Sequence, residues 1–272
     1  MKTRIISGVV AAAAVALLLL LNSFFSIVAV VAVALLAALA VYEILVGTGA
    51  VKKGAPVYIA MFYAAALQFS YSGIFINSNS LSVLFVLSIA IIAVLNHKNF
   101  TVNELAFTIA MPIIISFAFA CLEQIINPGD KTGLLYFLLL FNFACVTDIG
   151  AYFVGSAIGK HKLAPEISPK KTVEGAVGGI VCSVIGTLII SIVFSLILKT
   201  SVNVILLTLV TPVFSVIGMF GDLFASVIKR HFGIKDYGNI MPGHGGVLDR
   251  TDSILLIAPA FVFFLNLVGG IV

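Results

Sequence analysis

Long apolar stretches, separated by short polar segments, make up most of the chain. A helix that crosses a bilayer needs roughly 20 mostly apolar residues. Nine stretches approach or exceed that length, and they lie at residues 5–21, 24–46, 56–76, 81–95, 104–122, 133–155, 173–198, 202–228 and 253–271. We therefore expect about nine transmembrane helices in an all-α, polytopic integral membrane protein.

The first stretch begins in the manner of a signal peptide, because Lys2 and Arg4 precede an apolar run. No small-x-small cleavage site follows Leu21, however. We expect this helix to be retained in the protein, and a cleaved signal peptide is the alternative.

The composition supports the same class. Hydrophobic residues make up 61% of the chain and charged residues 10%, whereas a soluble domain is about half apolar and about a quarter charged. The chain lacks the charge for a water-facing surface, which excludes a disordered chain and a soluble enzyme. The three cysteines are odd in number and form no CxxC pair, so they indicate neither a disulfide framework nor a zinc site.

The basic residues predict the orientation. With the N-terminus inside, 13 of the 15 lysines and arginines fall in inner segments, and only Lys131 and Lys199 fall outside. This asymmetry follows the positive-inside rule and places the C-terminus outside. We therefore interpret the net charge of +4 as topological information, and we expect no nucleic-acid partner.

The polar segments suggest two regions. Residues 1–130 contain about five of the expected spans, and residues 131–272 form the expected catalytic region. This second region contains long polar loops at 156–172 and 229–252, which the predicted orientation places at the cytoplasmic face. Long loops on one face often carry function. We therefore expect a multi-pass protein of the cell membrane with an active site that faces the cytoplasm.

Two aspartates lie inside apolar stretches, Asp148 in the sixth and Asp222 in the eighth. Because a charge within a bilayer is costly, each is a candidate functional residue. A buried hydrogen bond to a neighbouring helix is the structural alternative. Glu43 and Glu123 lie near the ends of spans, and we interpret them as interfacial.

Asp222 begins a polar helix face. Ser226, Lys229 and Arg230 follow it at i+4, i+7 and i+8, so all four share one face of a helix. A carboxylate can hold a divalent cation, and basic side chains can hold phosphate. Lys229 and Arg230 are also typical of an anchor on the inner side of a membrane.

A glycine-rich segment follows this helix. Gly245 and Gly246 adjoin His244, and such a segment can turn tightly and present backbone N–H groups to an anion. Asp249 and Asp252 are three residues apart, so both can face one way at the start of the ninth helix. An acidic residue near a helix N-terminus is also favoured by the helix dipole, which is the simpler explanation.

The other polar loop contains Lys170, Lys171 and Thr172, which suit a phosphate group or act as solvated charges ahead of a helix. Mg²⁺ is usually bound through a few carboxylates together with substrate phosphates. The residues therefore indicate phosphate chemistry on a lipid at the cytoplasmic face. They name neither the lipid nor the nucleotide.

Two segments resemble a known family. The first is 27 residues long and contains Ser226-Val227-Ile228-Lys229-Arg230, Lys235-Asp236, Gly238, Pro242-Gly243-His244-Gly245-Gly246 and Asp249-Arg250-Thr251-Asp252. The second contains Asp148, Ala151-Tyr152-Phe153, Gly155, Gly159-Lys160, Pro165, Ser168-Pro169, Lys171-Thr172 and Glu174-Gly175. Both closely resemble phosphatidate cytidylyltransferases, also called CDP-diacylglycerol synthases. Ile149 departs from the pattern where Thr or Ser is expected, and Ser156 departs where a basic residue is frequent.

The resemblance implies a nucleotidyltransferase that makes CDP-diacylglycerol and pyrophosphate from CTP and phosphatidic acid. It also implies dependence on Mg²⁺ with a second cation beside it, and a homodimer whose cavity opens to the cytoplasm. Asp222 and Asp249 are then the expected metal ligands, with Asp148 and Asp252 as further candidates.

The resemblance also assigns residues to the substrates. The cations expected at phosphate groups are Lys171, Lys229, Arg230, Lys235 and Arg250. Ser226, Gly245 and Gly246 extend the expected binding surface, and His244 is expected to contact the triphosphate or donate to the leaving pyrophosphate. Phosphatidate is already ionised near neutral pH, so no strong general base is expected.

Two other functions remain open. A CTP-dependent lipid kinase of the polyprenol or phytol type would also use carboxylates at the membrane, but it would transfer the γ-phosphate and release CDP. An ion-coupled transporter would use Asp148 and Asp222 as coupling carboxylates. A transporter would not need Asp249-Arg250-Thr251-Asp252 beside a glycine-rich loop.

Overall fold

The structure is a computed structural model of the chain that describes residues 2–74, 76–98, 100–127, 132–198, 202–240 and 245–271. It is largely helical. The α-helices are α1 (Lys2–Asn22), α2 (Ile27–Tyr42), α3 (Ala55–Tyr71), α4 (Ser78–Leu95), α5 (Val102–Ile126), α6 (Gly133–Phe141), α7 (Thr147–Ile158), α8 (Val173–Leu198), α9 (Val204–His231), α10 (Leu248–Thr251) and α11 (Ile254–Val268). Two π-helical segments, η1 (Glu43–Gly47) and η2 (Asn142–Val146), continue α2 and join α6 to α7.

Each expected span overlaps a helix. Within the described part of the chain, six helices are long and apolar enough to cross a bilayer. They are Ile27–Gly47, Ser78–Leu95, Val102–Ile126, Gly133–Ile158, Val173–Ile197 and Val204–His231. The 17-residue helix α3 and the 15-residue helix α11 are shorter. A helical, multi-pass membrane protein is therefore confirmed, and the count of nine spans stays a prediction.

The chain divides into two compact units that are not consecutive in sequence. The first unit contains residues 1–123 and 229–251, and the second contains residues 124–228 and 252–272. Helix α9 passes from the second unit into the first between Ile228 and Lys229. The glycine-rich segment therefore folds with the N-terminal helices.

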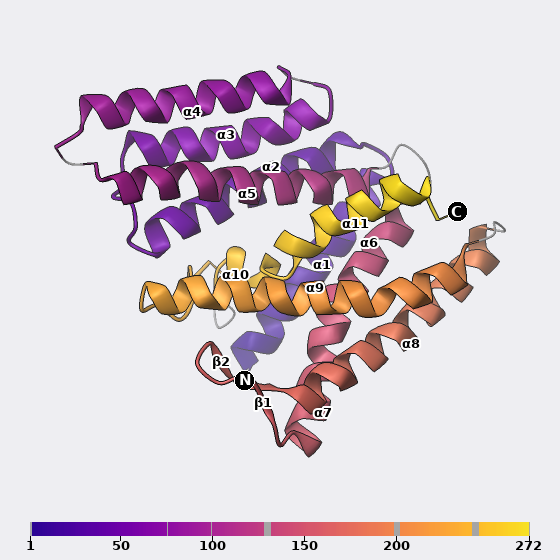
Figure 1. Cartoon of the computed structure of the whole chain (residues 1–272). Helices are drawn as coiled ribbons and strands as arrows, with labels where there is room; N and C mark the ends of the chain where they lie inside the picture. The colour runs from indigo at the N-terminus through magenta and orange to yellow at the C-terminus, as the bar shows by residue number, and fades with distance from the viewer. Residues whose placement is uncertain are drawn as a thin grey trace. The chain divides into compact units, whose positions relative to one another are not determined.

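In the first unit, α3 lies between α2 and α4 (Figure 1). Tyr63 on α3 stacks on Phe85 of α4 at a ring-centroid distance of 4.2 Å. The buried Gln68 side chain donates from Nε2 to the Ser116 carbonyl at 3.1 Å and so connects α3 to α5. A capping box begins α5, because Glu104 accepts from the Thr101 N–H at 2.7 Å.

In the second unit, the continuous helix formed by α6, η2 and α7 packs along α8 (Figure 1). Phe143 stacks on Phe214 at 5.0 Å and meets Phe261 edge to face at 5.5 Å. A polar contact accompanies this apolar packing. The Asn142 amide donates to Thr187 Oγ1 at 3.0 Å, as expected where polar side chains join helices within a membrane.

Glycines allow α7 and α8 to approach closely. A Cβ at Gly179 on α8 would lie 2.5 Å from the Thr147 carbonyl oxygen, and a Cβ at Gly175 would lie 2.6 Å from the Ala151 carbonyl oxygen. Gly150 on α7 faces Cys182 in the same way. Small residues of this kind are typical of tightly packed membrane helices.

The polar loop expected at 156–172 contains a small antiparallel hairpin that the all-α expectation did not include. Strand β1 (Lys162–Ala164) pairs with β2 (Ser168–Thr172), with Lys162 opposite Thr172. The polar segment expected to begin at residue 229 begins later, because α9 continues to His231. Gly233 adopts a φ of 66° just beyond that helix end, which a residue with a side chain rarely adopts.

Candidate functional site

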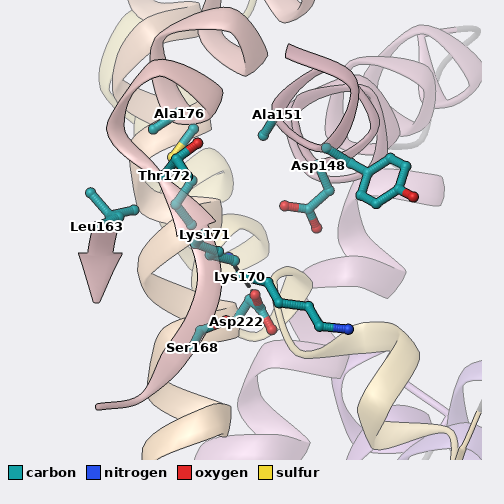
Figure 2. A pocket seen from close by; sticks show the side chains of 11 residues that line it. Asp148, Ala151, Leu163, Ser168, Lys170, Lys171, Thr172, Ala176 and Asp222 are labelled. Carbon is teal, nitrogen blue, oxygen red and sulfur yellow. Dashed lines mark ion pairs between the residues drawn. The ribbon is translucent and has the colours of Figure 1, made fainter. Parts of the chain in front are cut away.

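The second unit contains a cavity of about 260 Å³ (Figure 2). Its wall is built by α7, the β1–β2 hairpin, the first turn of α8, and α9. The lining residues are Asp148, Ala151, Tyr152, Leu163, Ser168, Lys170, Lys171, Thr172, Ala176, Met219 and Asp222. The cavity thus combines apolar side chains with carboxylates and ammonium groups.

Three of the predicted site residues meet at this cavity. Figure 2 shows Asp148 on α7 and Asp222 on α9, both at the cavity that Lys171 enters from β2. Lys171 Nζ forms an ion pair with Asp222 Oδ2, and both side chains are about one quarter exposed. The Lys171 Nζ atom is buried, and the Asp222 carboxylate is its ion-pair partner. An ammonium group has three N–H donors, so one carboxylate contact leaves donors for a phosphate oxygen.

The hairpin presents Lys171 in a fixed place. Lys171 lies one residue before Thr172, whose Oγ1 accepts from the Gly175 N–H at 3.1 Å and caps α8. Glu174 in the first turn of α8 accepts from the backbone N–H groups of Lys160 and His161, at 3.1 Å and 3.2 Å. The hairpin is thus held at both ends by the start of α8.

In the first unit, Asp249 is buried and organises the glycine-rich loop. Its Oδ1 accepts from Lys229 Nζ at 2.9 Å. Its Oδ2 accepts from the N–H groups of Tyr237 at 2.8 Å and of Gly246 at 3.0 Å. Gly245 has a φ of 88°, and a Cβ there would lie 2.8 Å from Asp249 Oδ2. The loop therefore requires glycine at this position, both for its backbone conformation and for the space beside the Asp249 carboxylate.

A second buried carboxylate in the first unit, Glu43, holds the same loop. It is only 3% exposed, and its oxygens accept from the N–H groups of Val247 at 3.0 Å and Leu248 at 2.8 Å. The sequence suggests an interfacial position for Glu43 and does not reveal this contact with the loop. The available signal was a carboxylate inside an apolar stretch, the same signal that identified Asp148 and Asp222.

The other predicted site residues differ in their burial and in the unit to which they belong. Ser226 is buried on α9, whereas Arg230, Lys235 and Arg250 are exposed. Asp252 belongs to the second unit, where its Oδ1 accepts from the Ser253 N–H at 2.8 Å. His244 lies outside the described residues.

In the described ranges, no three His, Cys, Asp or Glu side chains form a group that could hold a metal ion by protein ligands alone. A pair of carboxylates at one cavity does suit Mg²⁺, which commonly completes its shell with water and substrate phosphates. Asp148 and Asp222 fit that requirement. Asp249 already accepts three hydrogen bonds.

Comparison with known proteins adds independent information. Residues 2–268 match the family model described as the cytidylyltransferase family. A phosphatidate cytidylyltransferase of Bacillus subtilis is 37% identical over 282 aligned residues, which cover 98% of each chain. A phosphatidate cytidylyltransferase of Staphylococcus saprophyticus is 38% identical over 69% of this chain and 70% of its own, and one of Staphylococcus epidermidis is 41% identical over 61% of both.

Proposed function

Because the chain belongs to the cytidylyltransferase family, we propose that it is a CTP:phosphatidate cytidylyltransferase. A phosphate oxygen of phosphatidate attacks the α-phosphorus of CTP. The bond from that phosphorus to the bridging oxygen of the β-phosphate breaks. The products are CDP-diacylglycerol and pyrophosphate.

The ion pair of Lys171 with Asp222 beside Asp148 is the observation that best supports this chemistry. Two anionic substrates must approach each other, so the site has to neutralise charge and orient the reacting groups. Lys171 has an ammonium group that can donate to a phosphate oxygen. A phosphate bound to Lys171 would leave the Asp222 carboxylate free to hold a cation.

We propose that Asp148 and Asp222 would hold Mg²⁺, which would supply positive charge to offset the charge of the phosphate groups. Asp249 and Asp252 remain candidates through the family resemblance, which also suggests a second cation. The contacts of Asp249 favour a role in holding the glycine-rich loop.

From the family resemblance, we also propose further contacts to phosphate groups. Basic residues and backbone N–H groups serve this purpose without covalent chemistry. The proposed contacts come from Lys229, Arg230, Lys235, His244, Gly245, Gly246 and Arg250, with Ser226 on α9.

We also propose the number of spans and the orientation of the protein in the membrane. Nine spans, an inner N-terminus and an outer C-terminus follow from the distribution of lysine and arginine. That orientation places the two polar segments in the cytoplasm, where CTP is available, and the protein in the cell membrane. A homodimer is proposed from the family resemblance alone.

A product assay tests the proposed function. Purified protein with CTP, Mg²⁺ and phosphatidate in mixed micelles should release pyrophosphate and CDP-diacylglycerol in equal amounts, and chelation of Mg²⁺ should stop the reaction. Release of CDP with a phosphorylated lipid would instead show a CTP-dependent lipid kinase. A requirement for ATP in place of CTP would contradict the assigned nucleotide.

A further inference from the structure

Glu43 is a buried carboxylate for which the proposed chemistry has no use. It begins η1, at the end of the apolar helix Ile27–Gly47. Its two oxygens accept one hydrogen bond each from Val247 and Leu248, which follow it by 204 and 205 positions. All of these residues belong to the first unit.

The two N–H groups lie where the glycine-rich loop enters α10, the helix that carries Asp249 and Arg250. The first N–H groups of a helix have no partner within the helix. Val247 and Leu248 are themselves buried, at 3% and 1% exposure. Glu43 therefore satisfies two donors that would otherwise be buried without a partner.

The loop is shaped around the Glu43 carboxylate. A Cβ at Gly238 or at Gly246 would collide with Glu43 Oε1. At the other end of η1, a Cβ at Gly47 would collide with the Tyr237 carbonyl oxygen. Residues 237–238 and 246–248 thus contact η1 at two places, and each contact depends on glycine. π-Helical insertions are rare and are frequent at functional sites.

Glu43 and Asp249 accept from different backbone N–H groups among the described residues of the loop. Asp249 accepts from Tyr237 and Gly246, and Glu43 accepts from Val247 and Leu248. Four N–H groups are thus held by two buried carboxylates that come from opposite ends of the first unit's sequence. Glu43 fixes the backbone just before Asp249, and that backbone sets the direction of the Asp249 side chain.

We propose that Glu43 is a positioning residue for cytidylyl transfer. It fixes the backbone at Val247 and Leu248, and through α10 it sets the places of Asp249 and Arg250. The catalytic consequence rests on the proposed function, whereas the structural part concerns the loop alone. In this role Glu43 touches no reacting atom, and it acts through the residues of the loop.

The variant Glu43→Gln tests this proposal with little change of shape. The two N–H groups meet different oxygens of Glu43, and glutamine replaces one of these oxygens with an NH₂ group that cannot accept. In the full-length protein in detergent, hydrogen exchange of the peptide 245–251 should become about tenfold faster, because one hydrogen bond to a charged acceptor is lost.

The same variant should change kcat and the KM for CTP but not the KM for phosphatidate. The kcat should fall on the order of 10- to 100-fold, because a small displacement of reacting groups is sufficient for such a loss. The KM for CTP should rise, since the loop is proposed to meet the triphosphate, and the KM for phosphatidate should stay unchanged. A smaller fraction of folded protein would lower kcat and leave both KM values unchanged.

Two further variants complete the experiment. Glu104→Gln is the matched control, because the Glu104 carboxylate also accepts a backbone N–H in the first unit, but from Thr101 at the start of α5. It should leave the exchange at 245–251 and the kinetics unchanged. Gly238→Ala directs a methyl group against the Glu43 carboxylate from the loop side. It should reproduce the faster exchange and the lower kcat. It also provides a second test of the proposal if Glu43→Gln does not fold.

The results have distinct meanings. A Glu43→Gln enzyme with the wild-type kcat overturns the proposal, as does a lower kcat with unchanged exchange at 245–251. A uniform rise of exchange over the whole chain shows general unfolding and also overturns it. A wild-type protein without cytidylyl transfer contradicts the proposed function and the catalytic role together, and the exchange comparison then decides alone whether Glu43 holds the loop.

Discussion

At the residue scale, the two ion pairs formed by candidate site residues differ in how deeply they are buried. Lys229 and Asp249 are 12% and 2% exposed, so their pair lies in the interior of the first unit. Lys171 and Asp222 are more accessible and line a cavity. Removing one partner of a buried pair leaves an uncompensated charge, whereas an accessible pair contributes little to stability. The two pairs should therefore respond differently to substitution.

Asp249→Asn should impair both stability and turnover. The amide loses the charge that Lys229 requires, and breaking a buried pair in this way costs about 3–5 kcal/mol. We also expect turnover to fall about 100-fold, because the loop loses an acceptor that organises it. Thermal unfolding and product formation measure the two effects. Near-normal turnover would remove Asp249 from the site.

Lys171→Met should impair turnover with little effect on stability. The pair is partly exposed, so its loss should change the free energy of unfolding by about 1 kcal/mol or less. Turnover should fall about 100-fold, because the cavity loses an ammonium group that donates hydrogen bonds to phosphate. Lys162→Met, an exposed lysine on the neighbouring strand, is the matched control. Equal losses in both variants would assign the effect to general surface charge.

The sequence allowed Asp148, Lys171 and Asp222 to be identified, because a carboxylate in an apolar stretch and a basic loop are visible without a fold. It did not allow contacts between distant parts of the chain to be identified. For example, Glu43 and Val247 are 204 positions apart, and no local pattern joins them. The burial of Asp249 was equally hidden, since an aspartate near a helix start is ordinarily solvated.

At the scale of the elements, apolar length predicted the helices well, and the predicted ranges differ from the observed ones by a few residues. The π-helical segments and the β1–β2 hairpin were not predicted. A π-helix differs from an α-helix by one residue in a turn, and this leaves little trace in the apolar pattern. The hairpin has three residues in one strand and five in the other, which is too short for an alternating pattern.

The α7–α8 contact should be sensitive to side-chain volume. Gly179→Val adds atoms where a Cβ alone would lie 2.5 Å from the Thr147 carbonyl oxygen. Overpacking of this kind costs about 1–3 kcal/mol. Because α7 carries Asp148 and α8 follows Lys171, we also expect a loss of turnover.

The matched control lies on the same helix. Val177 is 57% exposed on α8, so Val177→Leu should preserve both the unfolding temperature and the turnover. The comparison requires only thermal unfolding in detergent and the product assay. A Gly179→Val protein as stable and as active as the control would show that α7 and α8 pack less closely than described.

At the scale of the whole molecule, the charge pattern predicts where the chain ends lie. A reporter enzyme that is active only outside the cytoplasm, fused after Val272, should be active. The same reporter fused after Lys98, in a segment expected inside, should be inactive. Activity in the reverse pattern would contradict the proposed orientation, and inactivity at both positions would contradict nine spans with an inner N-terminus.

The hydrogen bonds of Glu43 also have a consequence for biosynthesis. A ribosome adds about 5–20 residues per second, so the 204 positions between Glu43 and Val247 take roughly 10–40 s to synthesise. During that interval the nascent protein contains the carboxylate but not its amide donors. The hydrogen bonds of Glu43 therefore form only after Val247 and Leu248 have been synthesised, and products truncated before Val247 leave the Glu43 carboxylate without these two donors.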